Sequence, residues 1–160
     1  MNTRLVWVFF MLAFLVGCSS SPVTYDPTLE PTRVTISMLA DEKVNPNSSG
    51  EATPIEFTVF ELEDDSMFMS ADYEQLIEDY KKALSSNYID NYDYVLLPSQ
   101  FKFIEAIEVD EDTNYIGIMV SYSDPDTSQW KKVVKVKPLG RDYHLLTLFK
   151  ENEVILEKVE

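Results

Sequence analysis

The chain has 160 residues, and 45% of them are apolar, which is enough to form the core of a single domain. Its formal net charge is −15. This acidic excess argues against nucleic-acid binding, because such binding relies on Lys and Arg to displace counterions. It also argues against electrostatic binding to anionic lipid. Two explanations of the charge remain open: a solvated acidic surface that keeps the protein soluble, or a site for a basic partner.

The first 17 residues have the layout of a secretory signal. Arg4 precedes an apolar run from Leu5 to Val16, which is shorter than the roughly 20 residues that a membrane-spanning helix needs. The segment ends in Leu15-Val16-Gly17-Cys18, which resembles the bacterial lipobox. In that motif the Cys thiol is acylated and the signal is removed just before it.

Cys18 is the only cysteine of the chain. A lone cysteine in an exported protein cannot form an internal disulfide, so we interpret Cys18 as the acylated first residue of the mature chain and residues 1–17 as its signal peptide. The alternative is an incidental cysteine behind an ordinary secretory signal, or a buried cysteine in a core helix. Cleavage would leave 143 residues (160 minus 17) and, with Arg4 removed, a net charge of −16.

The residues after Cys18 predict a location and a tether. In enteric-type bacteria an Asp directly after the acylated Cys tends to retain a lipoprotein at the inner membrane, so Ser19 indicates the outer membrane. The segment Ser19–Pro31 contains three serines and three prolines, a composition that favours extended backbone over a packed core. At about 3.3 Å per residue, a dozen such residues could hold a domain up to about 40 Å from the lipid.

The domain is expected to begin with two strands joined by a long loop. Thr32–Ala40 alternates apolar and polar residues, the period of a half-buried strand. Asp41–Thr53 is polar and turn-prone, and its 13 residues exceed the roughly 2–5 of a hairpin loop. Ile55–Leu62 has apolar residues on both faces, which indicates a central strand or one covered by another element.

Ser70–Leu84 is the clearest helix. Ser70 can cap its start, and an apolar stripe with helical spacing follows it, consisting of Tyr73, Leu76, Ile77, Tyr80 and Leu84. We interpret this aromatic stripe as core packing. Six short strand-like runs follow, separated by turn residues: 92–97, 101–109, 115–122, 131–137, 143–149 and 154–159. About eight short strands with one inserted helix predict a β-sandwich in residues 32–160.

No set of residues points to catalysis. His144 is the only histidine and could be a general base or a ligand, but a lone strand histidine is more often on the surface or satisfied in the core. Asp110–Asn114 spaces oxygen atoms as a calcium loop does, yet Tyr115 stands where such a loop needs Gly and Ser121 where it needs Glu. An acidic hairpin tip is the simpler interpretation, and we expect no catalytic residue, metal or cofactor.

The residues together resemble a known family. The pattern consists of the lipobox, a tether, a long loop with Val44-Asn45 and Gly50, Val59-Phe60-Glu61-Leu62, Phe68, Asp72-Tyr73-Glu74-Gln75-Leu76, Leu97-Pro98, Tyr115-Ile116-Gly117, Tyr122 and Trp130-Lys131. In order and spacing over nearly all of residues 34–136, it is similar to TssJ (SciN, VasD), the outer-membrane lipoprotein family of type VI secretion. Lys131 and Ser123 stand where that family usually has Arg, a departure that we expect to affect partner charge more than fold.

The resemblance implies a transthyretin-like sandwich of two four-stranded sheets, with an extra helix and a protruding loop between the first two strands. Proteins of this family anchor the envelope-spanning secretion complex at the outer membrane, and the loop contacts the periplasmic C-terminal region of TssM. Carried onto this chain, the loop is Asp41–Thr53, and the expected partner contacts are Asp41, Glu42, Lys43, Val44, Asn45, Asn47 and Gly50. A transport or chaperone lipoprotein that binds a small ligand between its sheets is the alternative.

Overall fold

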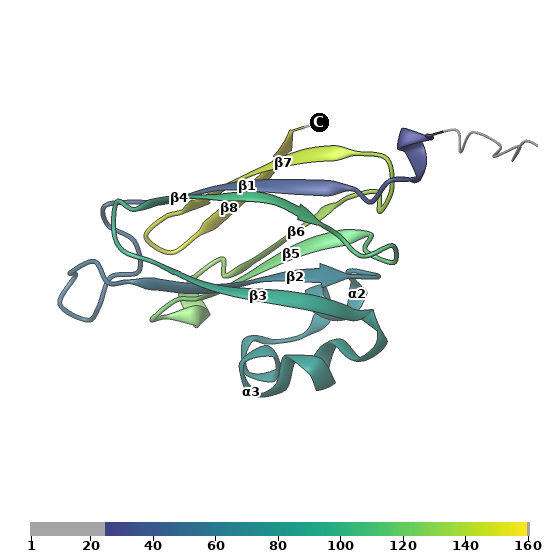
Figure 1. Ribbon diagram of the computed structural model, residues 1–160. Helices are drawn as coiled ribbons and strands as arrows, with labels where there is room; N and C mark the ends of the chain where they lie inside the picture. The colour runs from purple at the N-terminus through teal and green to yellow at the C-terminus, as the bar shows by residue number, and fades with distance from the viewer. Residues whose placement is uncertain (1–24, 160) are drawn as a thin grey trace, which may run out of the picture.

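Two four-stranded sheets face each other in the computed structural model, which describes residues 25–159 (Figure 1). The first sheet has the strand order β4-β1-β7-β8, with bounds β4 Phe101–Glu108, β1 Arg33–Ala40, β7 Asp142–Phe149 and β8 Val154–Val159. The second has the order β3-β2-β5-β6, with bounds β3 Tyr88–Leu96, β2 Ile55–Leu62, β5 Tyr115–Ser121 and β6 Lys131–Lys135. The predicted sandwich with its eight strands is confirmed.

β1 and β2 are inner strands of their sheets. β1 pairs antiparallel with β4 and parallel with β7, and the β7 pairing runs without a register shift from Arg33 opposite Asp142 to Ala40 opposite Phe149. β2 pairs antiparallel with β3 and β5. Because β1 and β2 belong to different sheets, the segment between them has to cross from one sheet to the other.

Apolar side chains fill the space between the sheets. Nineteen buried residues form one core cluster there, with Ile36 and Leu145 from the first sheet and Val59 and Ile118 from the second. The rings of Phe57 and Phe149 meet across the interior at 4.3 Å between centroids. The alternation recognised in the strands therefore buries one face of each sheet.

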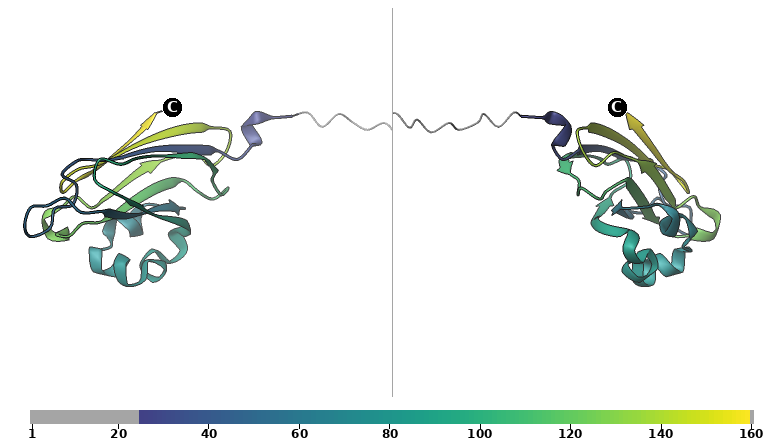
Figure 2. Two further views of the ribbon diagram at one scale, coloured as in Figure 1. Left: turned by 60° about the vertical axis from the view of Figure 1, so that its left-hand side comes forward. Right: turned by 90° about the vertical axis from the view of Figure 1, so that its right-hand side faces the viewer.

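Two helices cover part of the outer face of the β3-β2-β5-β6 sheet (Figure 2). They are α2, Ser66–Ser70, and α3, Tyr73–Leu84. Their side chains form a second cluster with Phe60 and Leu62, whose side chains point outward from β2. The two alternatives predicted for Ile55–Leu62, a central strand or cover from another element, thus both hold at this end of β2. Its other end keeps the polar Glu56 and Thr58 on the outer face.

The helical segment differs from its prediction in three details. Ser70 ends α2, a five-residue helix too short to show a 3.6-residue period. α3 is capped instead by Asp72, whose carboxylate accepts the N–H of Gln75 while the Gln75 side chain accepts the N–H of Asp72. Ile77 is 54% exposed because the helix contacts the sheet along a narrower stripe than predicted, and the helix is interrupted at Asp79, whose backbone is not helical.

Lys131 ties α2 to the second sheet. Its Nζ donates to the carbonyl oxygens of Phe68 at 2.9 Å, Met69 at 2.8 Å and Ala71 at 2.6 Å, and lies 4.7 Å from the centre of the Trp130 ring. Burial lowers the pKa of Lys131. Lys131 thus satisfies carbonyls at the end of α2, so this position contributes to the fold. The expected effect of Lys131 and Ser123 on partner charge stays a prediction.

Because Gly117 has no side chain, β5 can lie close to α2. A Cβ at this position would lie 3.1 Å from Cε1 of Phe68 and 3.2 Å from Cδ1 of Leu62. We expect Gly117→Val to lower the free energy of unfolding by about 1–3 kcal/mol, because the added methyl groups have to displace packed side chains. Urea denaturation measures this. Ser121→Val, on the same face of β5 but away from the helices, is the control, and an equal loss in both variants would contradict the prediction.

Two further boundaries differ from the sequence-based ones. β3 begins at Tyr88, four residues earlier than predicted, because its polar start at Asp90 and Asn91 lies on an edge strand that water reaches. The acidic residues 110–112 do not form a hairpin tip, since β4 and β5 lie in different sheets and the turn crosses between them.

Within residues 25–159, no helix has the length and apolar character needed to cross a membrane.

The chain enters the domain through a docked segment. Pro27–Leu29 forms a short 3-10 helix capped by Asp26, Pro31 forms a bridge with Leu139, and the carbonyl of Glu30 accepts the N–H of Gly140 at 2.8 Å. The expected tether Ser19–Pro31 thus has its last residues packed on the domain. Cys18 and residues 19–24 lie outside the described part of the chain, and by covalent geometry the seven-residue step from 18 to 25 can reach at most about 25 Å.

Candidate functional site

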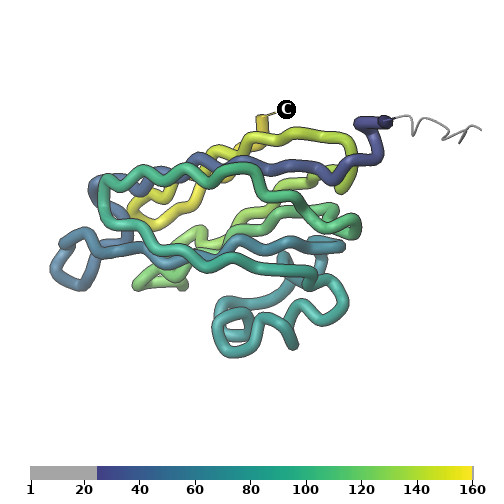
Figure 3. Tube along the Cα trace, viewed as in Figure 1, coloured from purple at the N-terminus to yellow at the C-terminus, as the bar shows by residue number. Residues whose placement is uncertain are grey.

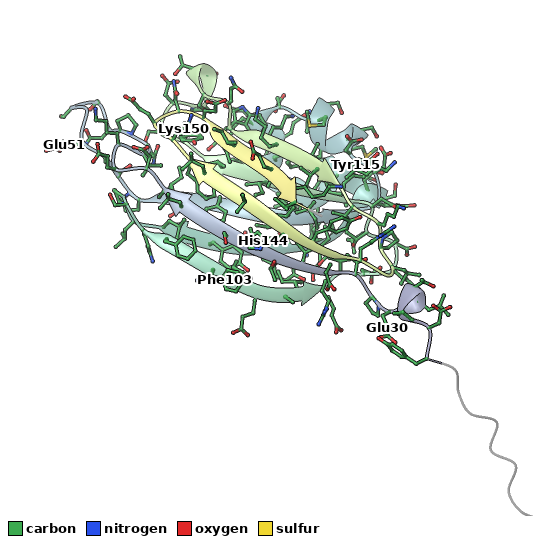
Figure 4. The ribbon with its side chains drawn as sticks, turned by 90° about the horizontal axis from the view of Figure 1, so that it is seen from above. Glu30, Glu51, Phe103, Tyr115, His144 and Lys150 are labelled. Carbon is green, nitrogen blue, oxygen red and sulfur yellow. The ribbon has the colours of Figure 1, made fainter. Side chains whose placement is uncertain are left out.

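The segment Asp41–Thr53, here called the 41–53 loop, projects from one end of the sandwich. Figures 1 and 3 show it at the opposite end from the point where the chain enters the domain. The view from above agrees: Glu51 and Lys150 lie at one end, and Glu30 lies at the other (Figure 4). The eight residues of β1 separate the two ends.

Asn45 fixes the base of the loop. Its Nδ2 donates to Oγ1 of Thr53 and to the carbonyl of Pro54, both at 2.9 Å. Its Oδ1 accepts the N–H of Ser123 at 2.6 Å and the hydroxyl of Ser123 at 2.9 Å. Asn45 is 6% exposed and has a φ of 49°, a left-handed backbone that Asn tolerates. One buried amide therefore joins both arms of the loop to the chain after β5.

The tip of the loop is a closed turn. Pro46 and Ala52 form an antiparallel bridge. Between them, Oδ1 of Asn47 accepts the N–H of Ser49 at 2.9 Å and of Glu51 at 3.0 Å. Gly50 has a φ of 80°, which a side chain would strain. Side-chain and backbone hydrogen bonds thus shape an exposed tip on a buried base.

The expected contact residues fall into two groups. Glu42, Lys43 and Gly50 are exposed, and Asp41 and Asn47 are half-buried. Val44 is completely buried and belongs to the core cluster between the sheets. The structure therefore contradicts the expectation that Val44 is a partner contact, because its side chain anchors the loop and presents no surface. The buried Asn45 likewise supports the loop.

A polar groove lies beside the loop, here called the Tyr122 groove. It has a volume of about 500 Å³. Its lining comes from the 41–53 loop, from the chain after β5 and from the β7–β8 turn: Asn45, Pro46, Asn47, Ser48, Tyr122, Ser123, Asp124, Thr127, Glu151 and Asn152. Tyr122 is 4% exposed, and its hydroxyl has no hydrogen-bond partner among the described residues. Burial, and to a lesser extent the negative charge of Glu153, raises the pKa of Tyr122.

Sequence reasoning did not find this groove, because its residues come from three separate segments. The sequence indicates Tyr122 only as the end of a strand-like run and, like Ser123, as part of the family resemblance. The signal that could have pointed to Ser123 is Asn45, since a polar residue next to the buried Val44 has to find partners outside the loop.

His144 lies beside two hydroxyl groups of β1. Its Nδ1 lies 3.1 Å from Oγ1 of Thr35, and its Nε2 lies 3.0 Å from Oγ of Ser37. Both ring nitrogens are thus occupied by hydroxyl groups of β1, on the outer face of the first sheet (Figure 4). Over residues 25–159, no group of three or more His, Cys, Asp or Glu side chains is arranged to hold a metal ion.

Comparisons with known proteins agree with this architecture. A family model described as type VI secretion lipoprotein (VasD, EvfM, TssJ) matches residues 32–152. The crystal structure of the T6SS lipoprotein TssJ1 from Pseudomonas aeruginosa is similar with a TM-score of 0.76 and 28% identity, covering 81% of this chain and 98% of that one. A search of curated protein sequences finds no match.

Two further solved structures share the fold. Serratia marcescens Lip, described as a membrane bound component of the type VI secretion system, has a TM-score of 0.70 and 22% identity over 80% of this chain and 97% of that one. A chain from the structure described as the TssM C-terminal domain from EAEC has a TM-score of 0.68 and 22% identity over 79% of this chain and 98% of that one. The family model covers well over half of the sequence, so the chain belongs to the type VI secretion lipoprotein family that includes TssJ and VasD.

Proposed function

We propose that this protein anchors the type VI secretion membrane complex at the outer membrane. Acyl chains on Cys18 hold it in the inner leaflet, and the 41–53 loop binds the periplasmic C-terminal region of TssM. The observation that carries the proposal is the placement of the loop: it projects at the end of the sandwich that lies opposite the N-terminal segment (Figure 1). An anchor at one end leaves the loop free to meet a partner in the periplasm.

The rigidity of the loop supports a binding role. Asn45 and Val44 hold its base, and Asn47 orders its tip, so few backbone conformations have to be lost when a partner binds. We assign contacts with TssM to the exposed Glu42, Lys43 and Gly50 and to the half-buried Asp41 and Asn47, and a supporting role to Val44 and Asn45.

The filled interior disfavours the alternative of a ligand-carrying lipoprotein. Such a protein needs a cavity between its sheets. Nineteen buried apolar side chains occupy this space here, among them the large Phe57, Phe149 and Leu145. A small ligand would have to displace packed core, whereas a protein partner needs only the exposed end of the sandwich.

Shortening the tip tests the proposal without disturbing the base. Replacing residues 47–51 by the dipeptide Asn-Gly leaves Pro46 and Ala52 at the spacing of a two-residue hairpin. We expect the variant to fold and to bind the purified periplasmic C-terminal region of TssM at least about tenfold more weakly, because the projecting surface is lost. Isothermal titration measures the affinity, and urea denaturation checks the fold.

The matched control removes charge at the opposite end of the sandwich. The double variant Glu111→Ser, Asp112→Ser changes two exposed acidic residues in the turn between β4 and β5. This control is expected to bind like the unaltered chain. An unchanged affinity of the tip variant would remove the 41–53 loop from the function.

A further inference from the structure

The hydroxyl of Tyr122 is a polar group without a hydrogen-bond partner among the described residues. Tyr122 is one of the residues that line the Tyr122 groove, and its hydroxyl is buried with no hydrogen bond to any residue between 25 and 159. A phenol can donate one hydrogen bond and can accept others. Leaving such a group buried and unpaired is unfavourable, which makes this hydroxyl a candidate hydrogen-bond partner for a bound group.

The ionised side chains that line the groove carry one sign of charge. They are those of Asp124 and Glu151, and Glu153 lies near enough to Tyr122 to raise its pKa. None of these three carboxylates forms an ion pair or a side-chain hydrogen bond within the described part of the chain, and the ion pair of Arg33 with Asp142 lies at the other end of the sandwich. Unneutralised carboxylates around a recessed surface attract a cation.

Neutral acceptors complete the lining. Thr127 contributes a hydroxyl and Asn152 an amide oxygen, and both lie among the lining residues. Several acceptor-bearing residues on different segments suit a group with several donors in fixed directions. An arginine guanidinium presents five N–H donors in a planar fork, whereas a lysine ammonium is a compact and strongly hydrated charge.

We propose that the Tyr122 groove receives an arginine side chain of the protein that the 41–53 loop binds, with Glu151 and Asp124 pairing its charge and the Tyr122 hydroxyl accepting one of its N–H groups. This inference rests on the proposed function for the identity of that protein. The loop and the groove share Asn45, Asn47 and the backbone between them, so a partner seated on the loop tip is next to the groove entrance.

Conservative variants of the groove test the inference in the full acylated chain. Glu151→Gln and Asp124→Asn are each expected to weaken binding to the periplasmic C-terminal region of TssM by about tenfold. Tyr122→Phe is expected to weaken it by about three- to tenfold. Binding by the carboxylate variants is also expected to depend less steeply on NaCl concentration, because an ion pair has been removed.

The stability of each variant separates a binding role from a structural one. Tyr122→Phe removes a hydroxyl that forms no hydrogen bond with any described residue, so the urea midpoint of the free chain is expected to stay the same or rise. Glu111→Gln, at the opposite end of the sandwich, is the charge control and is expected to leave both affinity and stability unchanged. A weaker complex together with an unchanged free protein supports the groove as a binding site.

The outcomes for the groove and for the loop can be distinguished. If the tip variant loses binding while the three groove variants bind as tightly as the unaltered chain, the groove holds only water and this inference is overturned, but the proposed function stands. Arginine-to-alanine variants of the partner at the contact surface can each be titrated with the unaltered chain and with Glu151→Gln. If the ratio of these two affinities is the same for every arginine variant as for the unaltered partner, no arginine is coupled to Glu151 and the inference also fails. If the unaltered chain does not bind this region of TssM, both proposals fall.

Discussion

Glu61→Ala is expected to lower the free energy of unfolding by about 3–5 kcal/mol, because three hydrogen-bond donors lose their acceptor. Glu61 is 2% exposed at the end of β2. Its carboxylate accepts the hydroxyl of Tyr92 at 2.9 Å, the N–H of Asp110 at 3.0 Å and the hydroxyl of Thr113 at 2.6 Å. Thr113 is completely buried, so water cannot replace the lost bond. For a domain with a total stability of about 5–15 kcal/mol, this loss is severe.

Urea denaturation of purified protein measures this effect, and Glu56→Ala is the matched control. Glu56 lies on the same strand, but its side chain is exposed on the other face, so its removal is expected to change stability by less than about 0.5 kcal/mol. Tyr92→Phe removes one of the three donors and is expected to cost less than Glu61→Ala. Equal stability of Glu61→Ala and Glu56→Ala would show that the carboxylate does not hold the turn between β4 and β5.

Cys18→Ser is expected to leave an uncleaved or soluble species that carries no acyl chain. A serine hydroxyl cannot replace the thiol that receives the lipid, and this is the only cysteine of the chain. Each buried methylene of an acyl chain contributes about 0.8 kcal/mol, and two or more chains give lasting attachment. Intact mass spectrometry of the membrane and soluble fractions measures the loss of the acyl mass and the change of fraction.

Ser20→Ala is the control for Cys18→Ser, because it changes a small polar residue close to the same processing site and leaves the thiol in place. It is expected to be processed, acylated and recovered with membranes. Recovery of the Cys18→Ser protein in acylated form from the membrane fraction would refute the assignment of this residue as the lipid anchor.

Local sequence patterns predicted most of the fold. Alternation identified the strands, and the two apolar faces of Ile55–Leu62 correctly indicated a covered central strand. Elements too short to have a period were missed, since the five residues of α2 make barely more than one helical turn. The same limit explains why the N-cap of α3 was predicted at the wrong residue. Ser70 and Asp72 are equally good N-cap residues, and the choice between them depends on where α2 ends.

The candidate site was predicted only in outline. The length of the segment between the first two strands indicated the loop, but burial separates Val44 and Asn45 from Glu42 and Lys43, and neighbours along the chain do not determine burial at a turn. Asn45 is ordered by Ser123, which is 78 positions away. The Tyr122 groove similarly depends on β5 and β7 ending beside the loop, a consequence of strand order that no local pattern contains.

β1 runs directly from the N-terminal segment to the 41–53 loop, and this has a mechanical consequence. A force applied between a lipid anchor and a partner held by the loop would act along the axis of β1. The hydrogen bonds to β4 and β7 lie across that axis, so they would be loaded together in shear and not opened one after another. The sandwich would therefore resist extension most strongly along the line that joins the N-terminal segment to the 41–53 loop.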